Sequence, residues 1–96
     1  MKIRPFHVSD APAVVALWQD CGLSRPWNDP HKDIARKLEV QRELFLVGTV
    51  DATLIASIMA GYEGHRGWVN YLAVAPSLRG RGYGRQLMRH VEQLLM

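Results

Sequence analysis

Apolar and polar positions follow two different rhythms along the chain, and these rhythms predict its elements. A period of two predicts a short strand over residues 2–6 and three longer strands over 44–50, 53–62 and 68–74. Asp51-Ala52 and the segment 63–67 separate the longer strands, and each is predicted as a turn. Because such short connections join neighbours, the three longer strands should form an antiparallel meander.

The helical rhythm appears first between residues 9 and 22. Ser9 or Asp10 can cap this helix, and Gly22 suits its C-terminal end. The side chains predicted to face inward are Val14, Val15, Leu17 and Trp18.

A second helix is predicted over residues 30–42, after the connection Arg25-Pro26-Trp27-Asn28. Asp29-Pro30 is a strong start signal, because a capping side chain precedes proline at the first helical position. The apolar stripe is narrow, and charged side chains occupy the other faces, so this helix should lie on the surface. The stripe consists of Ile34, Ala35 and Leu38, and the charged residues are Lys32, Asp33, Arg36, Lys37 and Glu39.

The third helical pattern covers residues 82–96 and follows the last strand. Its apolar face carries Leu87, Met88, Val91, Leu94 and Leu95. The order of elements is therefore strand, helix, helix, three strands, loop and helix. This order predicts an α/β or α+β fold with a mostly antiparallel sheet flanked by helices.

Composition narrows the class of protein only modestly. The chain has 96 residues, enough for a single domain, and a net charge of +3 with the positive residues scattered except around 79–85. A lone cysteine, Cys21, cannot form an internal disulfide. Without a signal-peptide core or an apolar run long enough to span a membrane, a cytoplasmic protein is expected. His7, His31 and His90 lack metal-ligand spacing, so no metal site is expected.

The loop before the last helix is the most informative segment. It reads Arg79-Gly80-Arg81-Gly82-Tyr83-Gly84-Arg85. Glycines at alternate positions let the backbone approach a ligand, and the following helix offers free N–H groups and partial positive charge. With three arginines around it, this loop is predicted to bind a pyrophosphate.

Two common phosphate motifs do not fit. No Lys-Ser or Lys-Thr pair follows the glycines, as a Walker-type loop requires. A dinucleotide fingerprint read from Gly80 and Gly82 would need glycine at Arg85 and an acidic residue beyond the end of the chain. A flexible Arg/Gly-rich loop of the RNA-binding kind is the other alternative.

Arg79-x-x-Gly82-x-Gly84, after a strand that ends at Val74-Ala75-Pro76, resembles the acetyl-coenzyme A signature of the GNAT superfamily of N-acetyltransferases. The order of elements is also similar to the first part of that fold, so the resemblance covers residues 1–96 as one partial domain. The segment around Trp27 further resembles small bacterial members of the YpeA type.

The resemblance implies acetyl-coenzyme A as cofactor, a primary amine as acceptor and attack of that amine on the acetyl thioester. It implies that the backbone around a bulge at 72–74 and the glycine loop bind the cofactor. These residues are Leu72, Ala73, Val74, Arg79, Gly80, Arg81, Gly82, Tyr83 and Gly84.

The general base is less defined. Some family members carry glutamate where this chain has Trp68, so Glu63 is the candidate by sequence, with His65 beside it. A solvated hairpin tip is the alternative for both. Asn70 is expected to share a strand face with Trp68 and to hold a relay water. Asp29 and Trp27 could belong to the acceptor site, or they could serve as a helix cap and a core anchor. Tyr71 and Tyr83 are expected to be a sheet residue and a loop residue, neither acting as the general acid.

The resemblance also implies that the chain stops early, after the helix that follows the glycine loop. GNAT domains continue with a splayed strand, a helix bearing a tyrosine acid and two more strands. A truncated domain with impaired activity is therefore expected. A non-catalytic GNAT-like binding module is the alternative function.

An edge strand at 69–74 without charge or proline, together with Leu94 and Leu95, further predicts a homodimer or larger oligomer. No nucleic-acid or membrane partner is expected.

Overall fold

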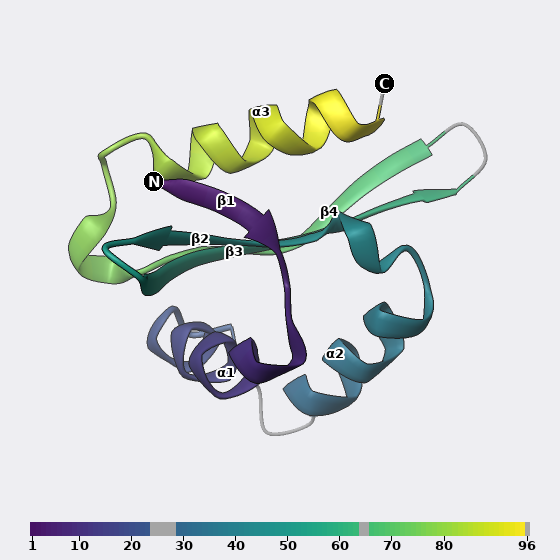
Figure 1. Cartoon of the computed structure of the whole chain (residues 1–96), viewed down its shortest axis with the longest axis horizontal. Helices are drawn as coiled ribbons and strands as arrows, with labels where there is room; N and C mark the ends of the chain where they lie inside the picture. The colour runs from purple at the N-terminus through teal and green to yellow at the C-terminus, as the bar shows by residue number, and fades with distance from the viewer. Residues whose placement is uncertain (24–28, 64–65, 96) are drawn as a thin grey trace.

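A single antiparallel sheet separates two layers of helices in the computed structural model, which describes residues 1–23, 29–63 and 66–95 (Figure 1). The strands are β1 (Lys2–Pro5), β2 (Phe45–Val50), β3 (Thr53–Glu63) and β4 (Arg66–Val74), and they lie in the order β1-β2-β3-β4. The helices are α1 (Ala11–Asp20), α2 (Pro30–Glu39) and α3 (Tyr83–Leu95). The predicted α+β fold with an antiparallel sheet is confirmed.

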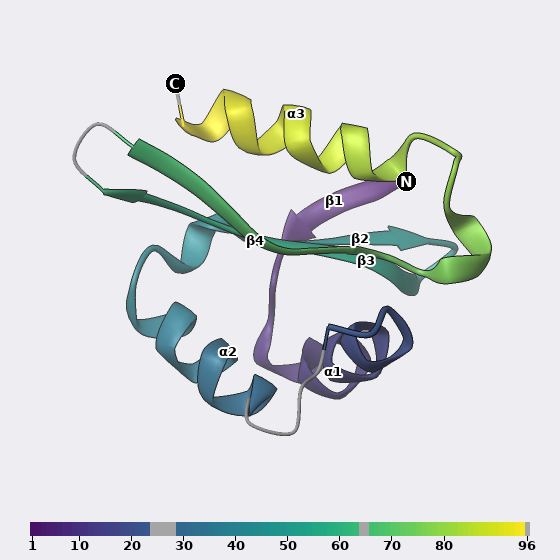
Figure 2. The same cartoon turned by 180° about the vertical axis from the view of Figure 1, so that it is seen from behind.

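The helices divide between the two faces of the sheet. Figures 1 and 2 show α1 and α2 on one face and α3 on the other. Side chains alternate across β2 accordingly: Phe45 and Val47 pack with α1, while Leu46 packs with α3. In the described part of the chain, no helix has the length and apolar character needed to cross a membrane.

The face covered by α1 is held together by aromatic contacts and one buried hydrogen bond. Phe6 stacks on Phe45 with ring centroids 4.2 Å apart, and Trp18 is fully buried. The indole N–H of Trp18 donates to the hydroxyl of Ser57 in β3 at 2.8 Å. A buried polar group that finds such a partner avoids a desolvation penalty of about 1–3 kcal/mol. This bond fixes α1 against the centre of the sheet.

The helix signals near residues 10–30 are confirmed, except for the cap of α1. Asp10 precedes this helix but makes no side-chain cap hydrogen bond, because its carboxylate accepts from Arg4 and from the backbone N–H of His7. All four residues predicted to face inward from α1 are buried, and Gly22 follows the helix with φ of +71°. Asp29 caps α2, accepting from the backbone N–H of His31 at 2.9 Å. Residues 24–28 lie outside the described part of the chain, so the roles expected for Trp27 stay predictions.

Two features of α2 were predicted wrongly. The helix ends at Glu39 rather than 42, because Gln41 adopts φ of +53° and its side-chain amide pairs with the backbone of Tyr62 in β3. The inward face also differs. Ala35 is exposed, whereas Lys37 is buried, so one of the charged residues expected in solvent lies in the interior.

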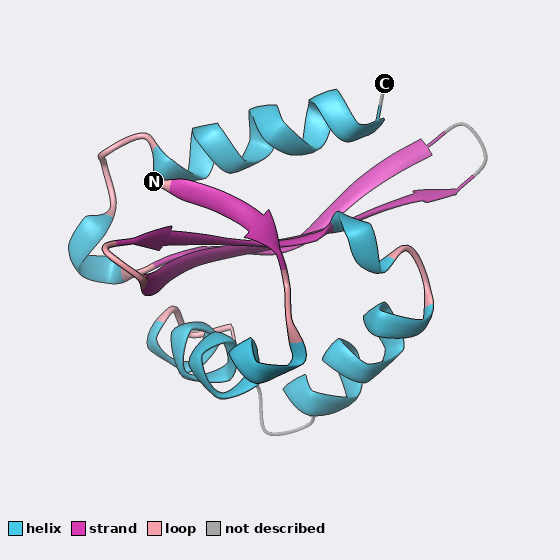
Figure 3. Ribbon diagram, viewed as in Figure 1, coloured by secondary structure: helices cyan, strands magenta, loops and turns pink. Residues whose placement is uncertain are grey.

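The hairpins follow the prediction closely. Asp51 and Ala52 both have positive φ, of +52° and +65°, which is the geometry of a two-residue type I′ turn. The second hairpin is longer than expected, since β3 reaches Glu63 and β4 begins at Arg66. In the secondary-structure colouring of Figure 3, this hairpin extends beyond the helices.

Candidate active site

The glycine loop joins β4 to α3 in a conformation that two of its glycines make possible. Gly80 and Gly82 have φ of +83° and +84°, a region that residues with a side chain rarely adopt. A Cβ built at either position meets no atom within 4 Å, so the space beside both is open. Gly84 differs, because its Cβ would make ordinary contact with Val74. The backbone of this loop is therefore accessible to a ligand from outside.

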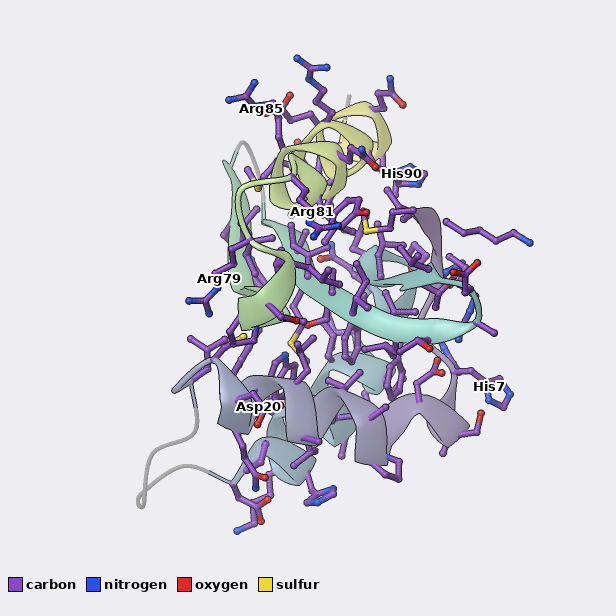
Figure 4. All side chains as sticks on the ribbon, turned by 90° about the vertical axis from the view of Figure 1, so that its left-hand side faces the viewer. His7, Asp20, Arg79, Arg81, Arg85 and His90 are labelled. Carbon is purple, nitrogen blue, oxygen red and sulfur yellow. The ribbon has the colours of Figure 1, made fainter. Side chains whose placement is uncertain are left out.

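Positive charge gathers at the same place. Arg79, Arg81 and Arg85 are exposed, and Figure 4 shows them at the end of the molecule where the loop enters α3. The single ion pair found among the described residues joins Arg4 and Asp10, so no described carboxylate neutralises these three guanidinium groups. Together with the N-terminus of α3, they make a favourable environment for an anionic group.

A β-bulge interrupts β4 just before the loop. The register moves from Met59 opposite Asn70 to Ser57 opposite Ala73, which leaves Tyr71 and Leu72 opposite a single residue of β3. Tyr71 takes φ of +53° at this point. The bulge was expected at 72–74 and begins one residue earlier.

The bulge sets which backbone groups of β4 face away from the sheet. The N–H of Ala75 donates to the carbonyl of Ile55 at 2.8 Å, and pairing alternates along an antiparallel ladder. Ala73 therefore turns its backbone toward β3, while Leu72 and Val74 turn theirs outward. The Val74 carbonyl accepts from Arg79 Nε and from Cys21 Sγ, each at 3.3 Å. The exposed side chain of Leu72 lies on the same open edge.

A pocket lies between α2 and the β3–β4 hairpin, next to the bulge. Its volume is about 270 Å³. The residues that line it are Asp33, Arg36, Lys37, Val40, Met59, Trp68 and Tyr71. It thus combines an apolar wall from the sheet with charged side chains from a helix.

Tyr71 connects this pocket to the bulge and to the core. Its hydroxyl donates to Asp33 Oδ2 at 2.5 Å, and its ring stacks on Trp18 with centroids 4.1 Å apart. Burial, followed by the hydrogen bond and the negative charge of Asp33, raises the pKa of Tyr71 to about 12. The phenol is therefore a hydrogen-bond donor throughout the physiological pH range.

Lys37 is the most unusual group in the pocket. Its side chain is 6 % exposed, its Nζ has no hydrogen-bond partner, and the Nζ lies 4.8 Å from the centre of the Trp68 ring. Burial lowers the pKa of Lys37, partly offset by attraction from the Glu43 carboxylate. The ring of Trp68 itself lies across Gly61, where an added Cβ would fall within about 2.0 Å of it. Glycine at position 61 is therefore what lets Trp68 form the pocket wall.

Glu63, the general base predicted from the sequence, lies on the hairpin away from Tyr71 and its pocket. Glu63 ends β3 opposite Arg66, which lies five positions before Tyr71 along β4, or about 16 Å away. His65 and the side chains of Glu63 and Asn70 lie outside the described part, so their roles stay predictions. No group of three His, Cys, Asp or Glu side chains in the described ranges is placed to hold a metal ion.

Sequence reasoning missed the pair formed by Asp33 and Tyr71 and the burial of Lys37. One signal was present: Asp33 and Lys37 are four residues apart on α2 and so share one face. That spacing gives no indication of the opposing wall, since Trp68 and Tyr71 come from a distant strand.

The chain is an α+β protein in which a bulged strand of an antiparallel sheet leads through a glycine loop into a helix N-terminus, and comparison with known proteins identifies its family. The family model of the acetyltransferase (GNAT) family matches residues 11–96. The chain is 49% identical over 96 residues to Acetyltransferase YE1169 of Yersinia enterocolitica, covering 100% of this chain and 68% of that protein. The chain belongs to the GNAT acetyltransferase family.

Solved structures agree with the fold. A protein from Pyrococcus horikoshii assigned to the acetyltransferases superposes with a TM-score of 0.86 at 18% identity, over 97% of this chain and 34% of its own. N-acetylglutamate synthase from Neisseria gonorrhoeae, solved with coenzyme A and L-arginine, gives a TM-score of 0.71 at 23% identity, over 94% of this chain and 20% of its own. At this level of identity the likeness concerns the fold alone.

Proposed function

We propose that this chain binds acetyl-coenzyme A and takes part in transferring its acetyl group to a primary amine. The observation that carries the proposal is the glycine loop, where two left-handed glycines open the backbone to a ligand at the N-terminus of α3. Family membership supports acetyltransferase chemistry in general. The proposed cofactor residues are those predicted from the sequence, Leu72–Val74 and Arg79–Gly84.

The residues present fit the cofactor in two respects. A pyrophosphate would lie against the open backbone of Gly80 and Gly82, with Arg81 and Arg85 balancing its charge. The outward backbone groups of Leu72 and Val74 would hold the arm that leads to the thioester. The cofactor supplies the activated acetyl group, and the protein supplies position and hydrogen bonds.

The pocket beside the bulge is the proposed site of the acceptor amine. Asp33 and Tyr71 place a carboxylate and a phenol where the pocket meets the bulge. A carboxylate there attracts and orients an amine by accepting hydrogen bonds from it. Glu63 stays the sequence-based proposal for the group that removes a proton, acting through water because of its distance along the hairpin. The proposed location is the cytoplasm.

Calorimetric titration with coenzyme A tests the cofactor proposal. Gly82→Asp is expected to abolish binding, because a carboxylate beside the pyrophosphate repels it. Gly82→Asn is the matched control, since it adds a side chain of the same size without charge and should weaken binding less. Equal binding by wild type and Gly82→Asp would refute the assignment. Absence of binding by a folded wild-type chain would favour the non-catalytic interaction module.

We also propose that copies of this chain associate through β4 or α3. In the described part of the sheet β4 pairs only with β3, and Val69, Leu72 and Leu94 are 37%, 40% and 49% exposed. An unpaired strand edge beside exposed apolar side chains favours pairing with a second chain. Light scattering after size exclusion should show a dimer or larger species that Leu72→Lys or Leu94→Glu reduces. A wild-type monomer at micromolar concentration would contradict this.

A further inference from the structure

The pocket under α2 contains a cation whose environment is incomplete. Lys37 is nine-tenths buried, and no described donor or acceptor reaches its Nζ. An isolated buried ammonium is costly, and proteins normally pair such groups. Glu43 exerts an attraction but makes no hydrogen bond with it. Lys37 also lines the pocket, so a partner bound there could reach this nitrogen once the Trp68 ring that covers it moves aside.

The surroundings of Lys37 specify the sign and shape of that partner. Arg36 adds a second cation to the pocket lining, and both favour an anion. The ring of Trp68 covers the Lys37 ammonium on one side, which holds it in place by a cation–π contact. The remaining wall, from Val40 and Met59, is apolar and suits a hydrocarbon side chain.

The opposite charge lies one helical turn away. Asp33 precedes Lys37 by four residues, which separates them by about 6 Å along the helix axis. Asp33 is also the residue joined to the bulge through Tyr71. The pocket therefore offers an acceptor for an ammonium or amine near the bulge and a donor for a carboxylate one turn further along α2.

On this basis, which rests on the proposed function above, we propose that the acceptor substrate is a small amine that also carries a carboxylate, namely a free α-amino acid. Lys37 and Arg36 bind its carboxylate, and Asp33 orients its amino group toward the bulge in β4. A free amino acid carries these two charges on groups bonded to the same carbon, so with a hydrogen bond at each end it spans one turn of helix. A polyamine would instead add positive charge next to two cations, the buried Lys37 and the exposed Arg36.

The proposal is tested by titrating the protein with each of the twenty L-α-amino acids in the absence of coenzyme A. NMR chemical-shift changes report binding. At least one is expected to bind saturably and to shift the Trp68 and Tyr71 resonances. The α-amide of the tightest ligand, which keeps the amine and side chain but lacks the carboxylate, should bind at least tenfold more weakly. Spermidine and a tripeptide amide should not compete. Failure of all twenty to bind, or equal binding of acid and amide, overturns the proposal.

Variants of Lys37 locate the carboxylate site. Lys37→Met keeps the length of the side chain and removes its charge, so amino-acid affinity should fall at least tenfold, while Lys37→Arg should retain more of it. Lys32→Met, an exposed lysine on the same helix, is the control and should bind normally. Circular dichroism checks that each variant folds. An unchanged affinity in Lys37→Met would overturn the assignment.

Failure of this inference can be told apart from failure of the proposed function. Coenzyme A binding with no Lys37-dependent amino-acid binding would remove the substrate class and leave the acetyltransferase proposal intact. Amino-acid binding that depends on Lys37, in a folded chain that does not bind coenzyme A, would remove the acetyltransferase proposal. It would leave the amino-acid site in this pocket intact.

Discussion

The hydroxyl of Tyr71 donates a hydrogen bond to the carboxylate of Asp33, and this bond joins a strained position in β4 to helix α2. Tyr71 has φ of +53° because two residues of β4 share one partner at the bulge. Its ring lies on Trp18, whose indole is bonded to Ser57. The bulge is therefore supported from α1, α2 and β3 together, which gives the candidate site a fixed geometry.

Removal of this hydroxyl should weaken the protein measurably. Tyr71→Phe keeps the ring on Trp18 but leaves the half-buried carboxylate of Asp33 without this donor. We expect the free energy of unfolding to fall by about 1 kcal/mol, a typical value for one such bond. Urea titration monitored by circular dichroism measures it. Gln19→Ala, at an exposed position of α1, serves as a neutral comparison, and an equally stable Tyr71→Phe would show that the bond contributes nothing.

The same bond should make stability depend on alkaline pH. The pKa of Tyr71 is raised from 10.0 to about 12 by burial and by Asp33. Since the folded-state pKa is above the unfolded one, the contribution is complete below pH 10 and is lost as the pH rises from 10 through 12. The stability difference between wild type and Tyr71→Phe should therefore shrink over this interval. A difference that stays constant between pH 9 and 12 would contradict the assignment.

Replacement of the buried ammonium should stabilise the chain. Lys37→Met removes a buried, unpaired charge and retains packing against Trp68, so we expect a gain of about 1 kcal/mol at pH 7. Because burial lowers the pKa of Lys37 below its ordinary 10.5, the penalty is largest below the folded-state pKa. It fades as the pH rises toward 10.5, and the gain should fade with it. Thermal melts at pH 7 and pH 10 measure both effects, and a destabilised variant at pH 7 would be the contrary result.

Local rules were enough to predict much of this fold, and distant contacts explain what they missed. The Asp29 cap, the Gly22 stop and the tight turn at Asp51-Ala52 depend on neighbouring residues only, and all were predicted. The burial of Lys37 depends on Trp68, thirty-one positions away, which no helical pattern can reveal. The early end of α2 likewise depends on Gln41 pairing with Tyr62.

The candidate site divides in the same way. The glycine loop could be predicted because its chemistry lies in consecutive residues. Strict alternation along the last strand predicts Leu72 on the same face of the sheet as Trp68. The bulge shifts this alternation by one residue after Asn70, so that Tyr71 and Ala73 pack on the α1 side instead. The pocket formed by α2 and β4 could not be predicted, because its two walls meet only in the folded chain.

The wall formed by Trp68 should be sensitive to its strand partner. Gly61→Ala would place a Cβ about 2.0 Å from the indole ring, so the ring must move. We expect a loss of about 1–3 kcal/mol, as for other overpacked sites, together with a changed Trp68 NMR resonance. Gly67→Ala is the matched control on β4, since its Cβ meets the flexible end of Leu95 at 3.0 Å and the backbone oxygen of Gly61 at an ordinary 3.8 Å. Equal effects of the two substitutions would show that Trp68 is not fixed over Gly61.

The glycines of the loop should respond unequally to alanine, because only some of them need to be glycine. At Gly82, with φ of +84°, alanine is strained although no atom lies within 4 Å, so Gly82→Ala should cost about 1–2 kcal/mol. Gly84 lies within α3 at a φ open to any residue, and its new Cβ would contact Val74 at an ordinary 3.7 Å. Gly84→Ala should therefore stabilise by up to about 1 kcal/mol, because alanine favours helix over glycine.

Urea titration of both variants measures these opposite signs, and coenzyme A titration adds a functional readout. If the cofactor lies on the open side of Gly82, then Gly82→Ala should weaken its binding more than Gly84→Ala does. A variant pair with the same sign of stability change would mean that the loop does not hold its left-handed conformation in solution. The expected sign difference depends on backbone conformation alone, so it can be checked before any acceptor substrate is known.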